Sequence, residues 1–118
     1  MQLQVKTILN AIQHFPGFVY QDIRLERQQD GRPSSIEISV GAHGGMPAKC
    51  SRCLEASPGY DWLPERSWLF VPLWGIRTFF LFAARRVQCA THGVVVEHVP
   101  WSDGKRPVTL AMMCFLSR

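Results

Sequence analysis

Four potential metal ligands constrain this chain more than any other feature of its sequence. Cys50 and Cys53 form one pair, C-S-R-C, and Cys89 and His92 form a second pair, C-A-T-H, with 35 residues between the two. Each pair puts two donors on one tight turn, and tetrahedral zinc needs two such turns facing each other. Three thiolates and one imidazole leave no open position for a substrate or an activated water. The spacing therefore predicts a zinc ribbon held by one structural Zn²⁺.

Other interpretations of the cysteine pairs stay open at this point: a redox Cys-x2-Cys, thiols buried together by coincidence, and a decayed site. A redox pair usually follows a strand and opens a helix, whereas here a Pro-Gly dipeptide soon follows the first pair. Gly93 after His92 supplies the permissive backbone of a metal-binding turn. Ser51 and Leu54 stand where such turns often carry Pro and Gly. His98 is a weaker candidate for the place of His92.

Length and composition indicate one globular domain. The chain has 118 residues, of which 47% are hydrophobic and 19% are charged. No apolar run is long enough to span a bilayer, and the first 18 residues lack the pattern of a signal peptide. We therefore expect a cytoplasmic protein without membrane contact, in which thiols stay reduced. The net charge of +4 and the pI near 9.2 suit an anionic partner without requiring one.

Hydrophobic periodicity predicts a β-rich α+β fold with an N-terminal helix, a β-hairpin, a small zinc ribbon and a C-terminal helix. The first helix is expected over about residues 2–14, and the last begins near Pro107, with Cys114 on its apolar side. Strands are expected over residues 18–27, 36–40, 67–73, 76–87 and 94–99. The first two should pair as the hairpin. Residues 76–87 are apolar on both faces, which is typical of a central strand.

This pattern predicts a single domain, 1–118, with three subregions. Residues 1–45 hold the helix and hairpin, residues 46–106 form the zinc ribbon, and residues 107–118 begin a helix leading out of the domain. No catalytic constellation is visible, because the acidic residues are dispersed and neither a nucleophile turn nor a phosphate-binding glycine loop occurs. We expect neither enzymatic activity nor a small-molecule substrate.

Basic residues interleave with aromatic ones, as on a nucleic-acid surface. Two close pairs are the candidates for contact with DNA phosphates: Arg85 with Arg86, and Lys105 with Arg106. The alternative is a solvated sheet face with the tryptophans in the core. The tryptophans concerned are Trp62, Trp68, Trp74 and Trp101.

A long run in the second half carries a family resemblance. Residues 68–105 read W-L-F-V-P-L-W-G-I-R-T-F-F-L-F-A-A-R-R-V-Q-C-A-T-H-G-V-V-V-E-H-V-P-W-S-D-G-K. This run resembles the N-terminal zinc-finger region of bacterial insertion-sequence transposases of the ISL-three family, and so do the upstream pieces F-P-G-F-V-Y, C-S-R-C and P-G-Y-D-W-L-P-E-R. The resemblance covers nearly the whole chain. It maps the finger ligands onto Cys50, Cys53, Cys89 and His92.

The resemblance implies a DNA-binding module that recognises the terminal inverted repeats of an insertion sequence as double-stranded DNA. Such transposases continue into a helix-turn-helix and a catalytic domain with an acidic, metal-binding triad. Neither fits into these residues, so the resemblance predicts a truncated or remnant protein without nuclease activity. The alternative is a stand-alone zinc ribbon that binds itself or inhibits an intact transposase through protein contacts. The apolar stretch 79–82 supports that alternative, because a small domain can leave such a strand exposed.

Overall fold

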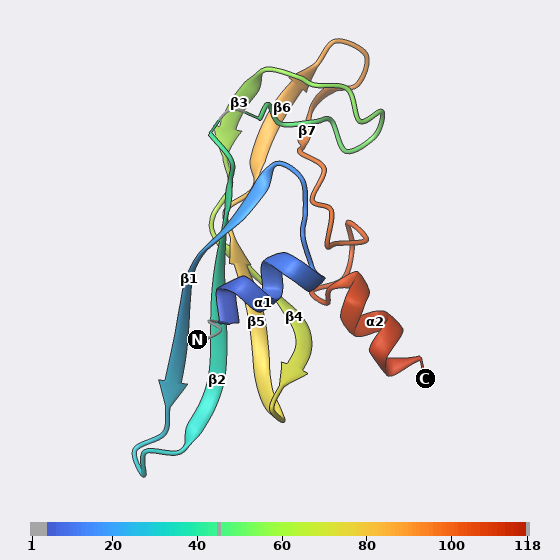
Figure 1. The fold of residues 1–118 in the computed structure, drawn as a ribbon. Helices are drawn as coiled ribbons and strands as arrows, with labels where there is room; N and C mark the ends of the chain where they lie inside the picture. The colour runs from blue at the N-terminus through green and yellow to red at the C-terminus, as the bar shows by residue number, and fades with distance from the viewer. Residues whose placement is uncertain (1–4, 45, 118) are drawn as a thin grey trace.

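The computed structural model describes residues 5–44 and 46–117. Its elements, in chain order, are α1 (Val5–Ile12), β1 (Phe18–Arg27), β2 (Pro33–Ala42), β3 (Gly59–Trp62), β4 (Arg66–Leu73), β5 (Ile76–Phe82), β6 (Arg85–Cys89), β7 (Gly93–Val96) and α2 (Leu110–Leu116). The strands form a four-stranded sheet, β1-β2-β5-β4, and a three-stranded sheet, β3-β6-β7 (Figure 1). The β-rich α+β class predicted from the sequence is confirmed.

The four-stranded sheet is built around the predicted hairpin. β1 and β2 pair antiparallel from Phe18 opposite Ala42 to Arg27 opposite Pro33. β2 pairs with β5 in parallel, and β5 pairs with β4 antiparallel. The β4–β5 connection is the tight turn at Trp74 and Gly75, which have φ values of 52° and 72°. Two successive positive φ angles are the geometry that suits a two-residue hairpin.

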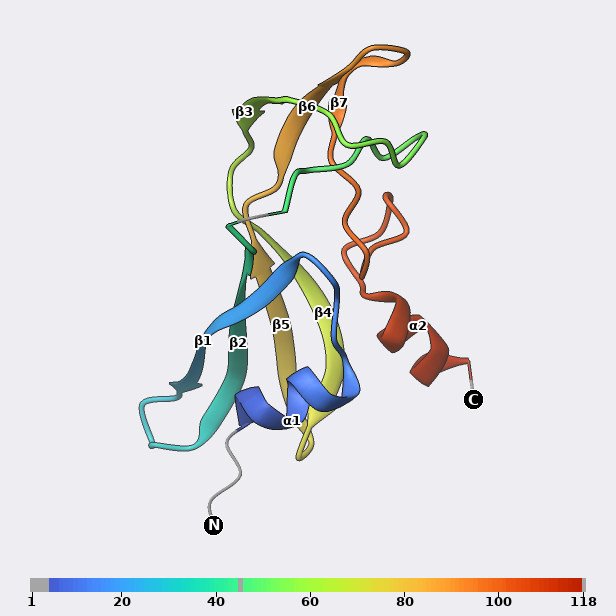
Figure 2. The same cartoon turned by 45° about the horizontal axis from the view of Figure 1, so that its top comes forward.

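The predicted strand 76–87 is two strands. β5 ends at Phe82, β6 begins at Arg85, and the chain passes between them from the four-stranded to the three-stranded sheet (Figure 2). Between β5 and β6, the carbonyl of Ala84 accepts a hydrogen bond from the N–H of Leu63 at 2.8 Å. Two alanines keep the run apolar, so hydropathy does not reveal the change of sheet. β5 is central, as predicted, and residues 46–106 supply strands to both sheets.

The three-stranded sheet contains a strand that the sequence did not indicate. β3 pairs antiparallel with β6 and starts at Gly59, the second residue of the Pro-Gly dipeptide. β6 pairs on its other side with β7. The upper part of Figure 1 shows these three strands projecting beyond the four-stranded sheet. The β6–β7 hairpin thereby carries the second ligand pair away from the main core.

Trp101 is the centre of the main core. It is 1% exposed and meets five aromatic rings edge-on, with ring centroids 5.2–5.7 Å apart. These rings belong to Phe15, Phe18, Trp68, Phe80 and Phe82. Two of the four tryptophans thus belong to the core. The other two, Trp62 and Trp74, are 66% and 73% exposed.

The helices are shorter than predicted. Residues 2–4 of the expected first helix lie outside the described residues, and in α1 Leu9 is buried whereas Ile12 is 70% exposed. α2 starts at Leu110, not near Pro107, because the preceding chain is extended along β4. The carbonyl of Pro107 accepts the N–H of Leu69 at 2.9 Å, and Thr109 donates back to Leu69 at 2.9 Å.

The end of α2 also differs from the expected packing. Cys114 is exposed, so it does not pack in the core as the stripe on this helix suggested. The short helix turns its buried side, at Met112, toward the sheet and leaves Cys114 outside. Neither helix in the described ranges is long and apolar enough to cross a membrane.

Candidate metal centre

Two turns of matching shape present the four ligands. The first contains Cys50 and Cys53, and the N–H of Leu54 closes it by donating to the carbonyl of Cys50 at 2.9 Å. The second joins β6 to β7 and contains Cys89 and His92. In each turn the residue after the second ligand has a left-handed backbone: Leu54 at φ 64° and Gly93 at φ 73°. Glycine suits this conformation, and leucine is strained in it.

The four ligand atoms converge. All of them lie within 4.8 Å of one another, and this is the only group of three or more His, Cys, Asp or Glu side chains close enough to hold a metal ion in residues 5–44 and 46–117. The Nδ1 atom of His92 lies 3.7 Å from Cys50 Sγ and 3.6 Å from Cys89 Sγ. Cys53 Sγ and Cys89 Sγ are 3.6 Å apart. The predicted meeting of the two pairs is confirmed.

These separations match a tetrahedral ion. Zinc bonds of about 2.3 Å to sulfur and about 2.0–2.1 Å to nitrogen give ligand-to-ligand distances of about 3.6–3.8 Å at tetrahedral angles. A disulfide would need its sulfurs at about 2 Å, well below the distance between Cys53 and Cys89. The described cysteines are all free thiols. The donor set and its geometry therefore fit a metal ion.

The local backbone favours the thiolate form of Cys89. The backbone N–H groups of His92 and Thr91 are the main reason that the pKa of Cys89 falls to about 6. The N–H of Arg52 also points at Cys50 Sγ, 3.4 Å away. Cys50 and Cys89 are buried, whereas Cys53 is exposed. Because thiolates rather than thiols bind metals, the second turn prepares Cys89 in the form that an ion requires.

A crossing segment fixes the two turns relative to each other. After β7, Glu97 forms a bridge with Cys50, and the N–H of His98 donates to the carbonyl of Lys49 at 2.7 Å. Two of the ligands, Cys50 and Cys89, belong to a small cluster of buried side chains with Ala48 and Val87. The backbone of residue 98 thus contributes to the site, while the ligand position is occupied by His92.

Sequence reasoning missed a buried ion pair next to the site. Glu97 has a side chain 1% exposed and Arg85 one 19% exposed. The carboxylate accepts the Arg85 Nε and Nη2 groups at 3.0 and 2.9 Å, and it also accepts the Arg85 backbone N–H at 2.7 Å. The sequence did contain one indication of this pair. Glu97 alternates with Val95 and Val99, on the side of the predicted strand that should face inward, and a buried carboxylate there needs a cationic partner.

Arg86 points to the opposite side of β6 and is more exposed. Its guanidinium binds the Asp61 carboxylate through Nε, at 2.7 Å, and through Nη2, and it lies over the ring of Tyr60 at 5.5 Å. Both side chains of the ion pair are 39% exposed. Hydrogen bonds from Arg86 hold the pKa of the Asp61 carboxyl below its ordinary value.

The second basic pair lies in the loop before α2. The backbone N–H groups of Lys105 and Arg106 both donate to Asp103 Oδ1, at 2.9 and 2.8 Å. Both basic residues are exposed, and the Arg106 guanidinium reaches Met113 Sδ at 3.6 Å. The structure therefore holds the backbone of this pair and leaves the two charges at the surface. Contact of either basic pair with DNA stays a prediction.

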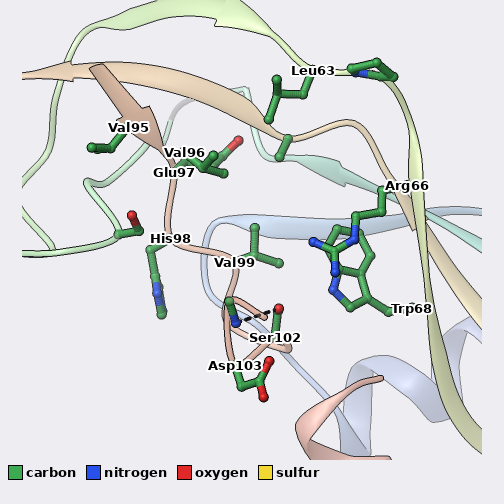
Figure 3. A pocket seen from close by; sticks show the side chains of 14 residues that line it. Leu63, Arg66, Trp68, Val95, Val96, Glu97, His98, Val99, Ser102 and Asp103 are labelled. Carbon is green, nitrogen blue, oxygen red and sulfur yellow. Dashed lines mark hydrogen bonds between the residues drawn. The ribbon is translucent and has the colours of Figure 1, made fainter. Parts of the chain in front are cut away.

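A cleft of about 650 Å³ opens between β4 and the segment that follows β7 (Figure 3). Arg66 and Trp68 line one side, with the guanidinium 4.6 Å from the ring centroid, and His98 and Asp103 line the other. The Nε1 atom of Trp68 is buried without a hydrogen-bond partner in the described part of the chain. The cleft carries charges of both signs, so it has no clear preference for an anionic ligand.

Together, a mixed sheet and a ribbon whose turns present three cysteines and a histidine define a small α+β domain of zinc-ribbon type. Two curated proteins resemble it in sequence: the transposases for insertion sequence element IS1557 of Mycobacterium tuberculosis strains CDC 1551 / Oshkosh and ATCC 25618 / H37Rv. Each is 34% identical over 86 residues, which make up 71% of this chain and 19% of the transposase. No family model and no solved structure matches the chain.

The chain thus contains a transposase-related region, and it spans about a fifth of the length of the relatives that it matches. The transposase resemblance expected from the sequence is supported at this level.

Proposed function

We propose that this chain is a zinc-dependent DNA-recognition module of an insertion-sequence transposase of the ISL-three type. In this proposal it binds the terminal inverted repeats of the element as duplex DNA and does not cut them. The observation that carries the proposal is the Cys50, Cys53, Cys89 and His92 quartet in a chain with a transposase-related region. A ribbon stabilised by metal provides a rigid surface for recognition, because no loop has to be ordered on binding.

In this proposal the quartet holds one structural Zn²⁺. Three cysteines and a histidine are a usual donor set for structural zinc, and four protein ligands leave no open coordination position. The bound ion supplies folding free energy, since it joins two turns that lie far apart in sequence. The protein's own part is to hold the turns with the backbone hydrogen bonds at Leu54 and His98.

Surface charge supports DNA as the partner. The net charge is +4, and Arg86, Lys105 and Arg106 present cationic groups at or near the surface. Arg85 has a different role in the proposal: its ion pair with buried Glu97 connects β6 to the segment after β7. Phosphate contacts made by exposed cations displace condensed counterions, so binding should weaken steeply with added salt.

The alternative is a stand-alone ribbon that mediates protein contacts or inhibits an intact transposase. Its support in the sequence was the apolar stretch 79–82. In the structure this stretch belongs to central strand β5, where Phe80, Leu81 and Phe82 are at most 7% exposed. These side chains are covered within the chain itself, so they do not favour a partner protein.

Gel-shift titrations at several salt concentrations test the proposal. Zinc-loaded protein should bind a duplex with the element's inverted repeat more tightly than a shuffled duplex, and its affinity should fall linearly on a log–log salt plot. Lys105→Ala and Arg106→Ala should each reduce the salt slope by about one and weaken all sequences alike. Equal affinity for repeat and shuffled duplexes would contradict sequence recognition. Salt-independent self-association without DNA binding would favour the alternative.

Metal analysis tests the ribbon separately. Elemental analysis should find one zinc per chain, and Cys89→Ser should lose it, whereas Cys114→Ser should keep it. Cys114 is the matched control because it is an exposed cysteine outside the quartet. Chelation should melt the three-stranded sheet, since binding of the ion is coupled to folding. Retention of full structure without metal would contradict a structural zinc site.

A further inference from the structure

The three-stranded sheet has one buried face and one exposed face. Val87 and Cys89 of β6 point inward and are 0% and 5% exposed. Arg86 and Gln88 alternate with them and point outward. Opposite Arg86 lie Asp61 on β3 and Val96 on β7. The exposed face therefore shows polar side chains along its central strand.

The residues that flank this polar row are unusually exposed for apolar side chains. Tyr60 is 57% exposed, and Val94 and Val96 are both 41% exposed. Val94 stands opposite Gln88, so the two valines run beside the polar row. Some DNA-binding proteins place the strands of a β-ribbon or β-sheet in the major groove, where arginine and glutamine donate to purine edges and apolar groups contact thymine methyls.

Arg86 is held in a definite orientation on this face. Asp61 accepts from Nε and from one N–H of Nη2, and the Tyr60 ring lies 5.5 Å from the guanidinium carbon. The bound carboxylate occupies one edge of the guanidinium. The N–H groups of Nη1 and the second N–H of Nη2 remain on the other side, as a fork with two parallel donors.

The two parallel donors of Nη1 and Nη2 match the acceptor pattern of one base. Guanine presents O6 and N7 as two adjacent acceptors in the major groove, and an arginine fork can donate to both at once. A side chain already fixed by an ion pair and a ring loses little conformational freedom on binding, which favours discrimination over general attraction. The Asp61 carboxylate also reduces the net charge at this point, so the site suits a base edge better than a phosphate.

We propose that Arg86 reads a guanine in the major groove of duplex DNA from the exposed face of the β3-β6-β7 sheet, and that Asp61 and Tyr60 position it. This inference rests on the proposed DNA-recognition function and specifies which residue reads sequence. Asp61 is a positioning residue, because it acts through Arg86.

The test begins with the full, zinc-loaded chain and a library of duplexes with a randomised central stretch. Selected duplexes are then measured with each guanine replaced in turn. At one position the wild type should prefer guanine by about 5- to 150-fold, the range expected for one bidentate contact. Arg86→Lys should lose this preference. Arg24→Lys, which alters an exposed ion pair with Glu37 in the other sheet, should keep it.

Two further measurements separate positioning from general attraction. Asp61→Asn removes a negative charge, so affinity for random duplex should stay equal or rise while the guanine preference falls. Replacing the selected guanine with 7-deazaguanine removes the N7 acceptor without changing the protein, and it should weaken the wild type but not Arg86→Lys.

Each outcome decides the inference. Selection of no sequence by the wild type would overturn both the recognition function and this inference. Specific binding with an undiminished guanine preference in Arg86→Lys would overturn the inference alone. Arg86→Ala, which removes the charge, gives the last outcome: uniform weakening of all sequences with the salt slope reduced by about one would also overturn the inference and identify Arg86 as a phosphate contact.

Discussion

Truncation of Glu97 is the sharpest test of what connects β6 to the segment after β7. The Glu97 carboxylate is 1% exposed and accepts three hydrogen bonds, all from Arg85. Glu97→Ala leaves a guanidinium that is only 19% exposed with its charge unpaired, and it removes the acceptor of the Arg85 backbone N–H. Breaking a buried pair by removing one partner costs about 3–5 kcal/mol. Domains are stable by about 5–15 kcal/mol, so the variant should be severely destabilised.

The matched control lies one residue further along the same strand. Arg86 and Asp61 form an ion pair with the same two-point geometry, but both side chains are 39% exposed. Water solvates either charge when the other is removed, so Asp61→Ala should cost far less than Glu97→Ala. Glu97→Gln should fall between them, because it keeps an acceptor oxygen and loses the charge.

Urea unfolding of the zinc-loaded protein measures these differences. Trp68 and Trp101 are 2% and 1% exposed, so their fluorescence reports the main core. A lower midpoint with an unchanged slope identifies a true loss of stability. Equal losses of stability for Glu97→Ala and Asp61→Ala would refute the reasoning, because burial would then not determine how much an ion pair contributes to stability. An unchanged midpoint for Glu97→Ala would refute it as well.

Three smaller effects follow from local geometry. Leu54→Gly should stabilise the protein by about 0.5–1 kcal/mol, because Leu54 is 52% exposed and its left-handed φ of 64° strains a leucine. Gly93→Ala should destabilise the protein, because Gly93 has φ 73°. Calorimetry measures both changes. Thr109→Ala should cost about 1 kcal/mol in thermal unfolding, since this side chain caps α2. The backbone N–H groups of Arg106 and its neighbour lower the pKa of the Asp103 carboxyl. The ionised Asp103 carboxyl should therefore stabilise the folded protein fully at pH values above the ordinary aspartate pKa. This stabilisation should be lost as the pH falls through the lower pKa that Asp103 has in the folded protein, and NMR titration of the carboxyl can follow the loss.

The metal centre was the most predictable part of the molecule. The two residues between each pair of ligands fix each turn locally, and the donor types restrict what two such turns can do together. The β1–β2 hairpin was predictable for a similar reason, because alternation and the turn at Gly31 act over a few residues. Neither inference needed knowledge of distant contacts.

The side of β1 that faces the core was not predictable. Val19, Ile23 and Leu25 share one parity of the strand, yet Tyr20 is the buried residue, and Val19 and Leu25 are 37% and 41% exposed. A register irregularity between Tyr20 and Asp22 shifts the parity along the strand. Such a shift depends on pairing with β2, and no period in the strand itself records it.

The adjacent arginines show most clearly where sequence reasoning stops. Arg85 and Arg86 form one basic pair in the sequence, but the pleat of β6 sends them to opposite faces. Arg85 pairs with the Glu97 carboxylate on the buried face of the sheet, and Arg86 pairs with the Asp61 carboxylate on the exposed face. The first pairing connects β6 to the segment that follows β7. The second holds Arg86 on the exposed face of the sheet, and we propose that this strand, which leads to Cys89 in the candidate metal centre, is also the one that reads DNA.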